Sequence, residues 1–343
     1  MQFDRSAVAG PYLDDILAQP RALEDTVAGL RDAPALAGLG GFDRIVLTGM
    51  GASYHALHPL HIQLVEHGFH AVVYETSELI YYHPAALTPR TLLIAVSQSG
   101  RSVEIVRLLD LAGGRVPMIA VTNTPESPLA TRADFTVLTH AGAESSVSCK
   151  TFVATLVALE WLGAALRGAD REQTEGALRE AAPAVLRYLA EWATKVGSLV
   201  NAMEGVRALF VTGRGASMAA AGNGGLILKE SAHFHAEGMT CSAFRHGPFE
   251  MSGPGVFVLV FAGDPKTAAL NENLVRDVCS AGARAALIGP QTDVDAFRIP
   301  FTAAAIHPVV EMLPVQLVSL ALAALAGHEP GRFSLLTKVA TIE

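Results

Sequence analysis

The sequence predicts an α/β protein of two tandem domains, each built on a doubly wound, mostly parallel sheet flanked by helices. The main observation is a repeat. The segment Ile45 to Ser53, IVLTGMGAS, recurs as LFVTGRGAS at Leu209 to Ser217, about half a chain later. In each copy an apolar β-rich run meets a Gly-x-Gly turn and then a helix-compatible run, as in the first strand, loop and helix of a parallel α/β sheet.

The length and the alternation of elements support the same class. A chain of 343 residues suits two domains, each with its own core. We expect an N-terminal helical segment over 1–38, a first domain over 39–195 and a second over 196–343, with ligands at the carboxyl ends of the strands. Further strands are predicted at 71–74, 92–96, 118–122, 135–138, 256–261, 285–288 and 301–306, with two long linker helices over 151–204 broken near Gly168 and a helix over 312–325.

The charge and the apolar segments exclude several classes of partner. The formal charge is −8 and no run of Lys or Arg occurs, so we expect neither nucleic acid nor an anionic membrane as partner. Residues 1–20 contain three aspartates and no long apolar core, which does not fit a signal peptide. The apolar stretch 315–326 is shorter than the about 20 residues that cross a bilayer. We therefore expect a cytoplasmic protein.

The cysteines and histidines do not predict a metal site. Cys149, Cys241 and Cys279 are an odd number without CxxC spacing, so we interpret them as packed thiols in a reducing compartment. His55, His58 and His61 recur on a predicted helix and suggest a metal at first sight, but their spacing carries them around the helix instead of toward one point. No metal and no cofactor are predicted.

A phosphate site is predicted directly after the strand at 92–96. The turn Ser97-Gln-Ser-Gly-Arg-Ser102 ends that strand and opens a helical run. Such a turn offers unpaired backbone N–H groups and hydroxyls to a phosphate. The alternative is an ordinary strand–turn–helix junction with a serine N-cap. The Gly-x-Gly turns lack the third glycine of a dinucleotide fingerprint, which argues against NAD.

These motifs together resemble the sugar isomerase (SIS) family. The phosphate turn, the paired Gly-x-Gly-Ala-Ser turns and the tail Leu336-Thr-Lys-Val-Ala-Thr-Ile-Glu343 are similar to the tandem-SIS isomerase half of glucosamine-6-phosphate synthase, from about Gly40 onward. The resemblance implies two tandem SIS domains and a sugar phosphate as ligand. It assigns phosphate binding to Ser97, Gln98, Ser99 and Ser102, with Ser53 lining the same pocket.

The resemblance also assigns a sugar loop and an acid–base set. Residues 142–151 resemble the loop that holds the sugar hydroxyls, which implies a side-chain contact from Ser148 and a backbone contact from Val147, in a loop one residue shorter than the synthase pattern. Glu230 corresponds to the base that moves a proton between C1 and C2, and His246 to the group that opens the sugar ring. In the family this histidine comes from a neighbouring subunit, so a homodimer is implied.

The chemistry suits these residue types independently of the resemblance. Moving a carbonyl between C1 and C2 requires a carboxylate beside the carbon acid and a histidine that exchanges protons near neutral pH. Without the family pattern, Glu230 would be interpreted as a helix-surface residue paired with Lys229. Lys338 resembles the lysine that forms an imine with the open-chain ketose, and its alternative is a solvated tail lysine.

Two departures from the synthase pattern direct the choice of reaction. Ile227 replaces a lysine of the synthase, which reduces the charge beside the substrate. No cysteine precedes Cys149, so a glutaminase domain with its N-terminal cysteine is not expected, and Arg101 resembles stand-alone tandem-SIS enzymes. We therefore expect an isomerising deaminase that converts glucosamine 6-phosphate to fructose 6-phosphate and ammonia. The alternatives are an isomerase or deglycase of another amino-linked sugar phosphate, and a non-catalytic sugar-phosphate sensor.

Overall fold

The computed structural model contains two compact units, each with its own sheet. It describes residues 4–31, 33, 41–335, 337 and 338. The sheet A unit comprises Arg21–Ala143, Lys150–Arg179 and Leu335–Glu343, and the sheet B unit comprises Met1–Pro20, Glu144–Cys149 and Glu180–Ser334. The chain therefore passes between the units several times, and six residues from the middle of the sequence are grouped with sheet B.

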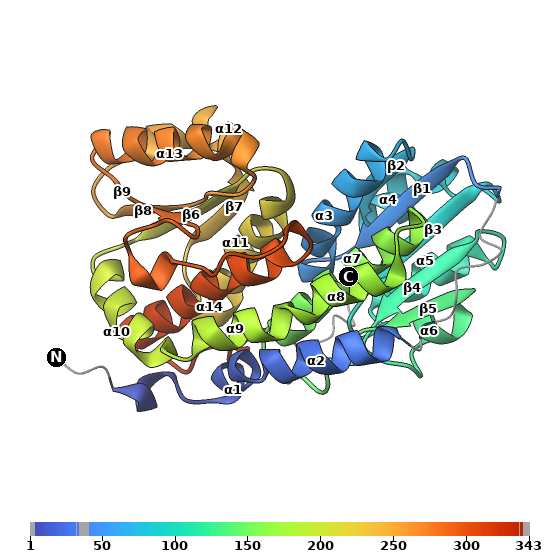
Figure 1. The fold of residues 1–343 in the computed structure, drawn as a ribbon, viewed down its shortest axis with the longest axis horizontal. Helices are drawn as coiled ribbons and strands as arrows, with labels where there is room; N and C mark the ends of the chain where they lie inside the picture. The colour runs from blue at the N-terminus through green and yellow to red at the C-terminus, as the bar shows by residue number, and fades with distance from the viewer. Residues whose placement is uncertain (1–3, 32, 34–40, 336, 339–343) are drawn as a thin grey trace. The chain divides into compact units, whose positions relative to one another are not determined.

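Sheet A has five parallel strands in the order β2-β1-β3-β4-β5 (Figure 1). Its strands are β1 (Arg44–Gly49), β2 (Ala71–Glu75), β3 (Thr91–Val96), β4 (Met118–Thr122) and β5 (Phe135–Leu138). The predicted strands of the first copy are confirmed to within one residue at each end. Because β1 leads outward to β2 and β3 leads the other way to β4, the connections diverge between β1 and β3, where ligands bind in such sheets.

Helices cover both faces of sheet A. The helices of this unit are α3 (Ala52–Glu66), α4 (Thr76–Tyr82), η2 (Pro84–Ala86), α5 (Val103–Ala112), α6 (Pro128–Arg132), α7 (Lys150–Leu166) and α8 (Arg171–Arg179), with most of α2 (Gln19–Leu30). Leu79, Leu108 and Leu129 from α4, α5 and α6 join Val46 and Leu93 of the sheet in one buried cluster. Helices α3 and α7 pack on each other, with α3 against β1 and α7 against β4.

Sheet B repeats the arrangement with four parallel strands in the order β7-β6-β8-β9. The strands are β6 (Ala208–Gly213), β7 (Ala236–Thr240), β8 (Val256–Phe261) and β9 (Arg284–Ile288). Strand β7 is missing from the sequence prediction, because its residues Ala236, Glu237 and Gly238 are of types depleted in strands. It forms because its backbone completes hydrogen bonds with β6.

The predicted strand over 301–306 is wrong. Residues Ala304–Ile306 form the 3-10 turn η6, which leads directly into α14 (His307–Ala326). Three consecutive alanines at 303–305 have little β preference, and Pro308 occupies the first turn of the helix, where its fixed φ is favourable. The pattern of apolar residues at this point therefore belongs to the entry of a helix.

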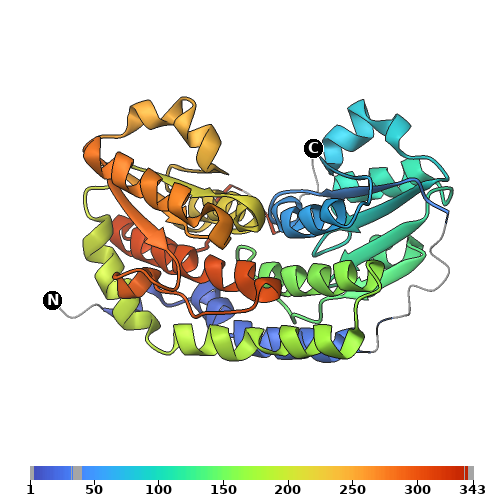
Figure 2. The same cartoon turned by 45° about the horizontal axis from the view of Figure 1, so that its top comes forward.

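The helices of the sheet B unit also lie on both faces of their sheet. They are η1 (Arg5–Val8), α1 (Pro11–Leu17), α9 (Ala181–Leu189), α10 (Trp192–Met203), η3 (Gly215–Ser217), α11 (Met218–Ala232), α12 (Cys241–Arg245), η4 (Pro248–Met251), α13 (Pro265–Ser280), η5 (Asp295–Phe297), η6 and α14. Phe244 of α12 and Leu274 of α13 pack with Val258 on one face. On the other face, Gly224 of α11 lies against Val211 of β6 and Val315 of α14. Figure 2 shows α13 in orange and α14 in red.

The linker prediction is partly wrong. Four helices, α7 to α10, occupy the region predicted as two, and a break does occur at Gly168, which has a φ of +67°. Helices α7 and α8 belong to the sheet A unit, whereas α9 and α10 belong to the sheet B unit. These helices are therefore part of the two cores, because their apolar faces are buried against their own units.

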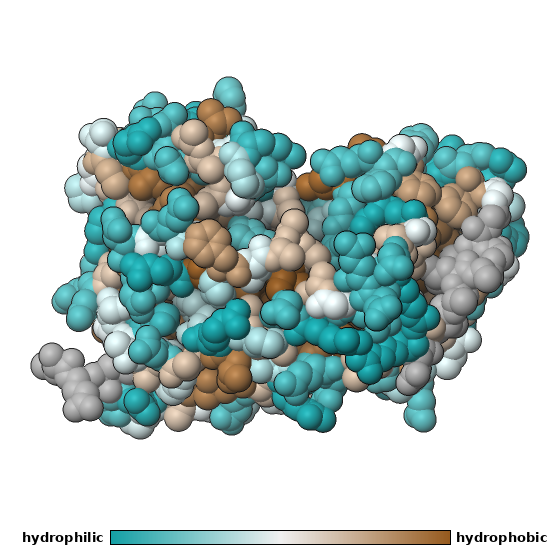
Figure 3. All heavy atoms as spheres, viewed as in Figure 1, coloured by the Kyte–Doolittle hydropathy of each residue, from teal (hydrophilic) through white to brown (hydrophobic). Residues whose placement is uncertain are grey.

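Helix α14 is the central helix of the sheet B unit. It extends over 20 residues, longer than the stretch predicted from the apolar run, and its residues from Pro308 to Ala323 are buried. By length and composition the segment Ala304–Ala326 is able to cross a membrane, but 83% of its apolar window is buried inside the structure. It is therefore the core helix of an α/β fold of the soluble type. Polar residues cover most of the face in Figure 3, and apolar ones appear there as separate small areas.

Helix α11 is fixed at its start and in its middle. Ser217, directly before the helix, donates a hydrogen bond of 2.7 Å to the buried carboxylate of Glu311 on α14, and His307 lies 3.3 Å from the same oxygen. Burial lowers the pKa of His307, but the hydrogen bond and charge of Glu311 outweigh it and the pKa is raised. Further along, a Cβ on Gly225 would lie 2.2 Å from the backbone nitrogen of Gly238 in β7, so helix and strand touch backbone to backbone.

We predict that Gly225→Ala destabilises the chain by about 2 kcal/mol or more, because the added methyl meets backbone that has no room to move. The matched control is Gly176→Ala on the exposed side of α8, where a Cβ meets nothing within 4 Å. That variant should gain about 0.5 to 1 kcal/mol through helix propensity. Chemical denaturation followed by circular dichroism measures both, and equal effects at the two positions would contradict the close contact.

Candidate active site

The predicted phosphate turn is folded tightly between β3 and α5. Ser97 is 9% exposed, and its hydroxyl accepts a hydrogen bond of 3.1 Å from the Gly100 amide. Gly100 has a φ of +62°, and a Cβ there would lie 2.2 Å from the Ser127 hydroxyl oxygen. Only glycine fits this position without displacing Ser127. The turn is therefore shaped by contacts inside the sheet A unit.

The same turn keeps hydrogen-bonding groups at its surface. The carbonyl of Gln98 accepts bonds of 3.2 Å from the hydroxyls of both Thr122 and Thr124, which fixes the turn to the end of β4. Ser102 is the N-cap of α5 but makes no capping hydrogen bond with its side chain. The side chains of Gln98, Ser99 and Ser102 are half-buried. Hydroxyls and the first N–H groups of α5 together suit an anion.

Ser53 lies at the same edge of the sheet. Strand β1 ends at Gly49 and runs beside β3, with Thr48 opposite Ala95. Ser53 begins α3 just beyond this strand and is half-buried. Because parallel strands end at one edge, the two turns are neighbours at the point where the chain connections diverge. The five residues predicted to bind phosphate, Ser53, Ser97, Gln98, Ser99 and Ser102, thus come from adjacent turns.

Residues Glu144–Cys149 of the predicted sugar loop (142–151) belong to the sheet B unit, and this part is closed by its own carboxylate. Glu144 Oε1 accepts a hydrogen bond of 3.0 Å from the Cys149 amide, just before α7 begins. Between these ends, Val147 is fully buried and Ser148 is half-buried. A buried Val147 side chain is compatible with the predicted backbone contact to a sugar, and both assignments stay predictions.

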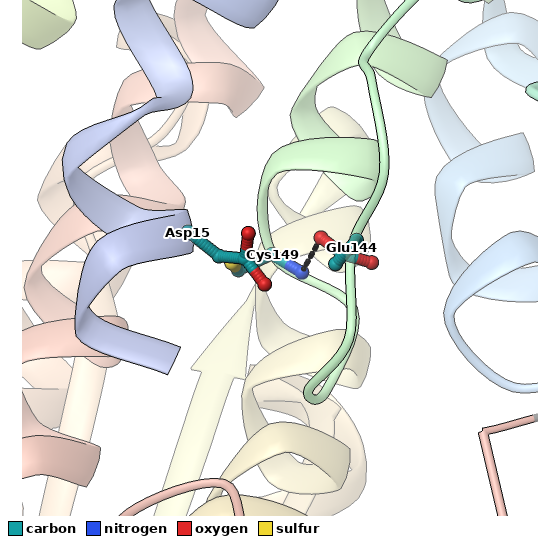
Figure 4. Close-up of side chains that lie close together, drawn as sticks. All are labelled: Asp15, Glu144 and Cys149. Atoms are coloured by element: carbon teal, nitrogen blue, oxygen red, sulfur yellow. Dashed lines mark hydrogen bonds between the residues drawn. The ribbon is translucent and has the colours of Figure 1, made fainter. Parts of the chain in front are cut away.

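Two residues of this loop, together with Asp15 of α1, form a group with the composition of a metal site. Asp15, Glu144 and Cys149 are buried, and one potential ligand atom from each lies within 4.8 Å of the other two (Figure 4). Carboxylate and thiolate ligands suit zinc among the common cations. The Glu144 carboxylate already closes the loop through the Cys149 amide, so the cluster has a structural role without an ion.

Cys241 is buried as expected for a packed thiol, but Cys279 is exposed, against expectation.

Glu230 is half-buried near the end of α11. The alternative interpretation makes Glu230 the ion-pair partner of Lys229. In the structure the Lys229 ammonium lies 3.7 Å from the Glu237 carboxylate on β7. Ile227, the position of the replaced lysine, is 1% exposed, so it packs inside the unit and offers no charge to a ligand. The next residue after Glu230, Ser231, is fully buried and holds the start of the C-terminal tail.

That contact joins three predicted site segments within the sheet B unit. The Gly331 amide donates a hydrogen bond of 2.9 Å to the Ser231 carbonyl. The Gly331 carbonyl accepts a bond of 2.8 Å from the Ser146 hydroxyl. One glycine thus connects the sugar loop, the end of the helix that carries Glu230, and the chain that continues to Lys338.

His246 lies at the other edge of sheet B from Glu230. Helix α11 runs back from the carboxyl end of β6, so its last turn is at the edge where the parallel strands begin. Strand β7 and then α12 follow, and His246 comes after α12 as an exposed residue. Five residues of β7 at about 3.3 Å each separate the two edges by about 16 Å. Within one chain, Glu230 and His246 are therefore not brought together.

Lys338 is half-buried and is grouped with the sheet A unit. The remainder of the tail motif, at 336 and 339–343, lies outside the described residues.

Sequence reasoning missed Glu144, Ser146, Ser231 and Gly331. Glu144 lies six residues before α7, and an acidic residue close to a helix start is a signal that the sequence does contain. A buried serine or glycine that is hydrogen-bonded to a distant part of the chain leaves no local sequence pattern.

We predict that Ser99→Ala and Ser102→Ala each weaken the binding of inorganic phosphate by about tenfold, since a hydrogen bond to a charged group contributes about 1.5 kcal/mol or more. Gly100→Ala should lower binding further through its clash with Ser127. Ser280→Ala, at an exposed helix end in the sheet B unit, is the control. Isothermal titration calorimetry provides the affinities, and unchanged binding in the turn variants would rule out this site.

Known proteins share this architecture. The family model described as the SIS domain matches residues 41–165 and again 203–326. The glutamine–fructose-6-phosphate aminotransferase (isomerizing) of Pyrococcus horikoshii is 34% identical over 348 residues, covering 96% of this chain and 57% of that protein. The corresponding protein of Thermococcus kodakarensis is 30% identical, covering 96% and 58%. This chain therefore spans less than two thirds of the length of these relatives.

Solved structures show the same fold. The C-terminal domain of glucosamine-fructose-6-phosphate aminotransferase from Francisella tularensis has a TM-score of 0.82 at 21% identity, over 99% of this chain and 100% of that one. Glucosamine-6-phosphate deaminase from Thermotoga maritima has a TM-score of 0.79 at 18% identity, over 97% and 100%. With two family matches that follow its two sheets, the chain belongs to the SIS domain family, as a tandem pair of SIS domains.

Proposed function

We propose that this chain is a phosphosugar enzyme that isomerises and deaminates glucosamine 6-phosphate, giving fructose 6-phosphate and ammonia. The observation that carries the proposal is the pair of hydrogen bonds at Gly331. They connect the loop expected to hold the sugar, the helix end with Glu230 and the tail with Lys338. These are the segments that an amino-sugar isomerase has to assemble around C1 and C2.

The phosphate is held by the turn between β3 and α5. Its hydroxyls and helix N-terminus bind an anion without a cluster of basic residues, which suits a chain of net charge −8. Fixing the phosphate at C6 limits where the other carbons reach. We expect Ser148 and the Val147 backbone of the sugar loop to contact the sugar hydroxyls.

The proton transfer is assigned to Glu230. In the open-chain aldose, the carboxylate removes the proton from C2 and returns it to C1, while the C1 oxygen gains a proton. The product of this step is the C2 imine of the ketose. A half-buried carboxylate suits the role, since it is less strongly solvated than one at the open surface.

Ammonia leaves when the lysine nitrogen replaces the imine nitrogen at C2. The Lys338 amine adds to C2 and expels ammonia, which forms an imine between the lysine and the ketose. Water then adds to C2 and releases the lysine, so that one glucosamine 6-phosphate and one water give one fructose 6-phosphate and one ammonia. Lys338 is half-buried, and a lysine amine is a nucleophile able to form an imine with a ketose carbonyl.

Ring opening is assigned to His246 of a second copy of the chain. Because His246 and Glu230 of one chain lie at opposite edges of sheet B, the His246 that acts beside a given Glu230 comes from a second copy in this proposal. His246 is exposed and follows a short helix at the sheet edge, so it is available to a partner. A homodimer in which each site receives the partner's histidine satisfies this requirement.

The names of the relatives support the substrate class. The aminotransferases named above act, by name, on fructose 6-phosphate, and the Thermotoga maritima neighbour is named for glucosamine 6-phosphate. The second candidate is an isomerase or deglycase of another amino-linked sugar phosphate, since the buried Ile227 stands where the synthase pattern has a lysine. A non-catalytic sensor would require the phosphate turn but not Glu230, His246 and Lys338 together.

We expect the purified chain to release equal amounts of ammonia and fructose 6-phosphate from glucosamine 6-phosphate. Glu230→Gln should keep the affinity for sugar phosphate within about threefold and lose turnover by about a hundredfold or more, because the base acts only in the reaction. Coupled assays for both products measure turnover, with Glu237→Gln as the control on β7. Absence of turnover with glucosamine 6-phosphate and galactosamine 6-phosphate would refute the deaminase.

We also expect two inactive variants to complement each other. When Glu230→Gln and His246→Asn chains are dissociated, mixed in equal amounts and reassembled, half of the dimers are hybrid and each has one intact site. Activity should then return to about one quarter of the native value. Each variant alone remains inactive, and a mixture that also stays inactive while forming hybrid dimers would contradict the shared site.

A further inference from the structure

We infer that Ser146 and Gly331 are positioning residues, which form a junction that holds the start of the Lys338 tail against both the sugar loop and the end of α11. We call this set the Gly331 junction; it consists of Tyr12, Ser146, Ser231 and Gly331. The inference rests on the proposed function for its catalytic consequence. Its structural consequence, a tail whose start is fixed, can be measured without any activity.

Both polar groups of the Gly331 backbone are used. The amide donates to the Ser231 carbonyl at 2.9 Å and the carbonyl accepts from the Ser146 hydroxyl at 2.8 Å. Gly331, Ser231 and Ser146 are all buried, so water does not replace these partners easily. The tail therefore starts from a point that is fixed in two directions.

The position also requires glycine. Gly331 has a φ of +75°, and a Cβ there would lie 2.2 Å from Ser146 Oγ and 2.7 Å from Tyr12 Cβ. Neither neighbour is free to move aside. Tyr12 is fully buried with its hydroxyl 3.0 Å from that of Ser319, and burial raises its pKa well above the ordinary value. Tyr12 thus forms a rigid wall of the junction.

The chain entering the junction is tied to the same helix end. His328 Nε2 lies 2.9 Å from the Ala232 carbonyl, and its ring stacks on that of His233 with centroids 4.8 Å apart. Ala232 and His233 directly follow Ser231. The tail is therefore held beside the end of α11 before and at Gly331, through contacts to the three residues that directly follow Glu230.

The sugar loop is fixed at the opposite side of the junction. Glu144 closes the loop through the Cys149 amide, and Ser146 between them holds Gly331. The loop residues Val147 and Ser148 follow Ser146 directly. A shift of the loop on ligand binding is therefore transmitted to the tail, because the Ser146 hydroxyl of the loop is hydrogen-bonded to the Gly331 carbonyl of the tail. The seven residues from Gly331 to Lys338 then start from a position set by the sugar loop and the Glu230 helix.

The variants Ser146→Ala and Gly331→Ala test the junction in the full chain. Hydrogen–deuterium exchange is measured by mass spectrometry on peptides covering 328–335. We expect exchange to become at least about tenfold faster in both variants, because Ser146→Ala removes a buried partner of the tail and the methyl group of Gly331→Ala clashes with Ser146 and Tyr12. Ser146→Thr keeps the hydroxyl and should remain within about twofold of the native chain.

The controls separate the junction from general effects. Gly327→Ala introduces a side chain at a similar φ of +72°, but its Cβ would meet nothing within 4 Å. Ser334→Ala removes an exposed hydroxyl of the same segment. Exchange in 328–335 that is unchanged in Ser146→Ala and Gly331→Ala, or equally fast in Gly327→Ala, would overturn the inference.

The catalytic consequence is measured on the same proteins. In Ser146→Ala and Gly331→Ala we expect kcat to fall about tenfold or more while KM changes less than about threefold, because the phosphate anchor is untouched and the lysine is misplaced. Borohydride trapping of fructose 6-phosphate on Lys338 should fall in parallel and recover in Ser146→Thr. A rise in KM with an unchanged kcat would contradict a positioning role. If the native chain turns over no sugar phosphate, the proposed function fails, and the exchange result alone decides the junction.

Discussion

The two hydrogen bonds of Gly331 are the constraint on which the assembly of the candidate site depends in the sheet B unit. A single buried peptide group satisfies its N–H on the helix that carries Glu230 and its C=O on the sugar loop. Leaving either group unpaired in this interior would cost about 1 to 3 kcal/mol. This cost keeps the sugar loop, the end of α11 and the start of the tail in contact with one another. The local conformational preferences of these segments would not bring them together.

The duplicated architecture is used differently in the two units. In the sheet A unit the turns after β1 and β3 keep Ser53 and Ser102 half-buried and without side-chain caps, which suits an external phosphate. In the sheet B unit the matching serine, Ser217, is bound by the Glu311 carboxylate, and Asp264 caps α13 through the Lys266 amide. Carboxylates of the chain itself occupy the corresponding positions, which is consistent with one phosphate site for each chain.

The opposite placement of Glu230 and His246 follows from the topology of a parallel sheet. A helix returns the chain to the edge where strands begin, so residues at a helix end and residues after the next strand lie at different edges. The fold thus separates two groups that the proposed chemistry requires together. Association of two copies removes the separation, so the dimer is a requirement of the mechanism in this proposal.

The sequence by itself determined the tandem α/β architecture, most strands and the tight turn between β3 and α5, because repeats, apolar runs and Gly-containing turns are local signals. Tertiary structure decided the remainder. Strand β7 exists only through its backbone pairing with β6, and the predicted strand at 301–306 became a helix entry because Pro308 and the following apolar residues pack as α14. Ser146, Ser231 and Gly331 meet through contacts between residues far apart in the chain, and such contacts have no period or spacing from which a sequence reading could derive them.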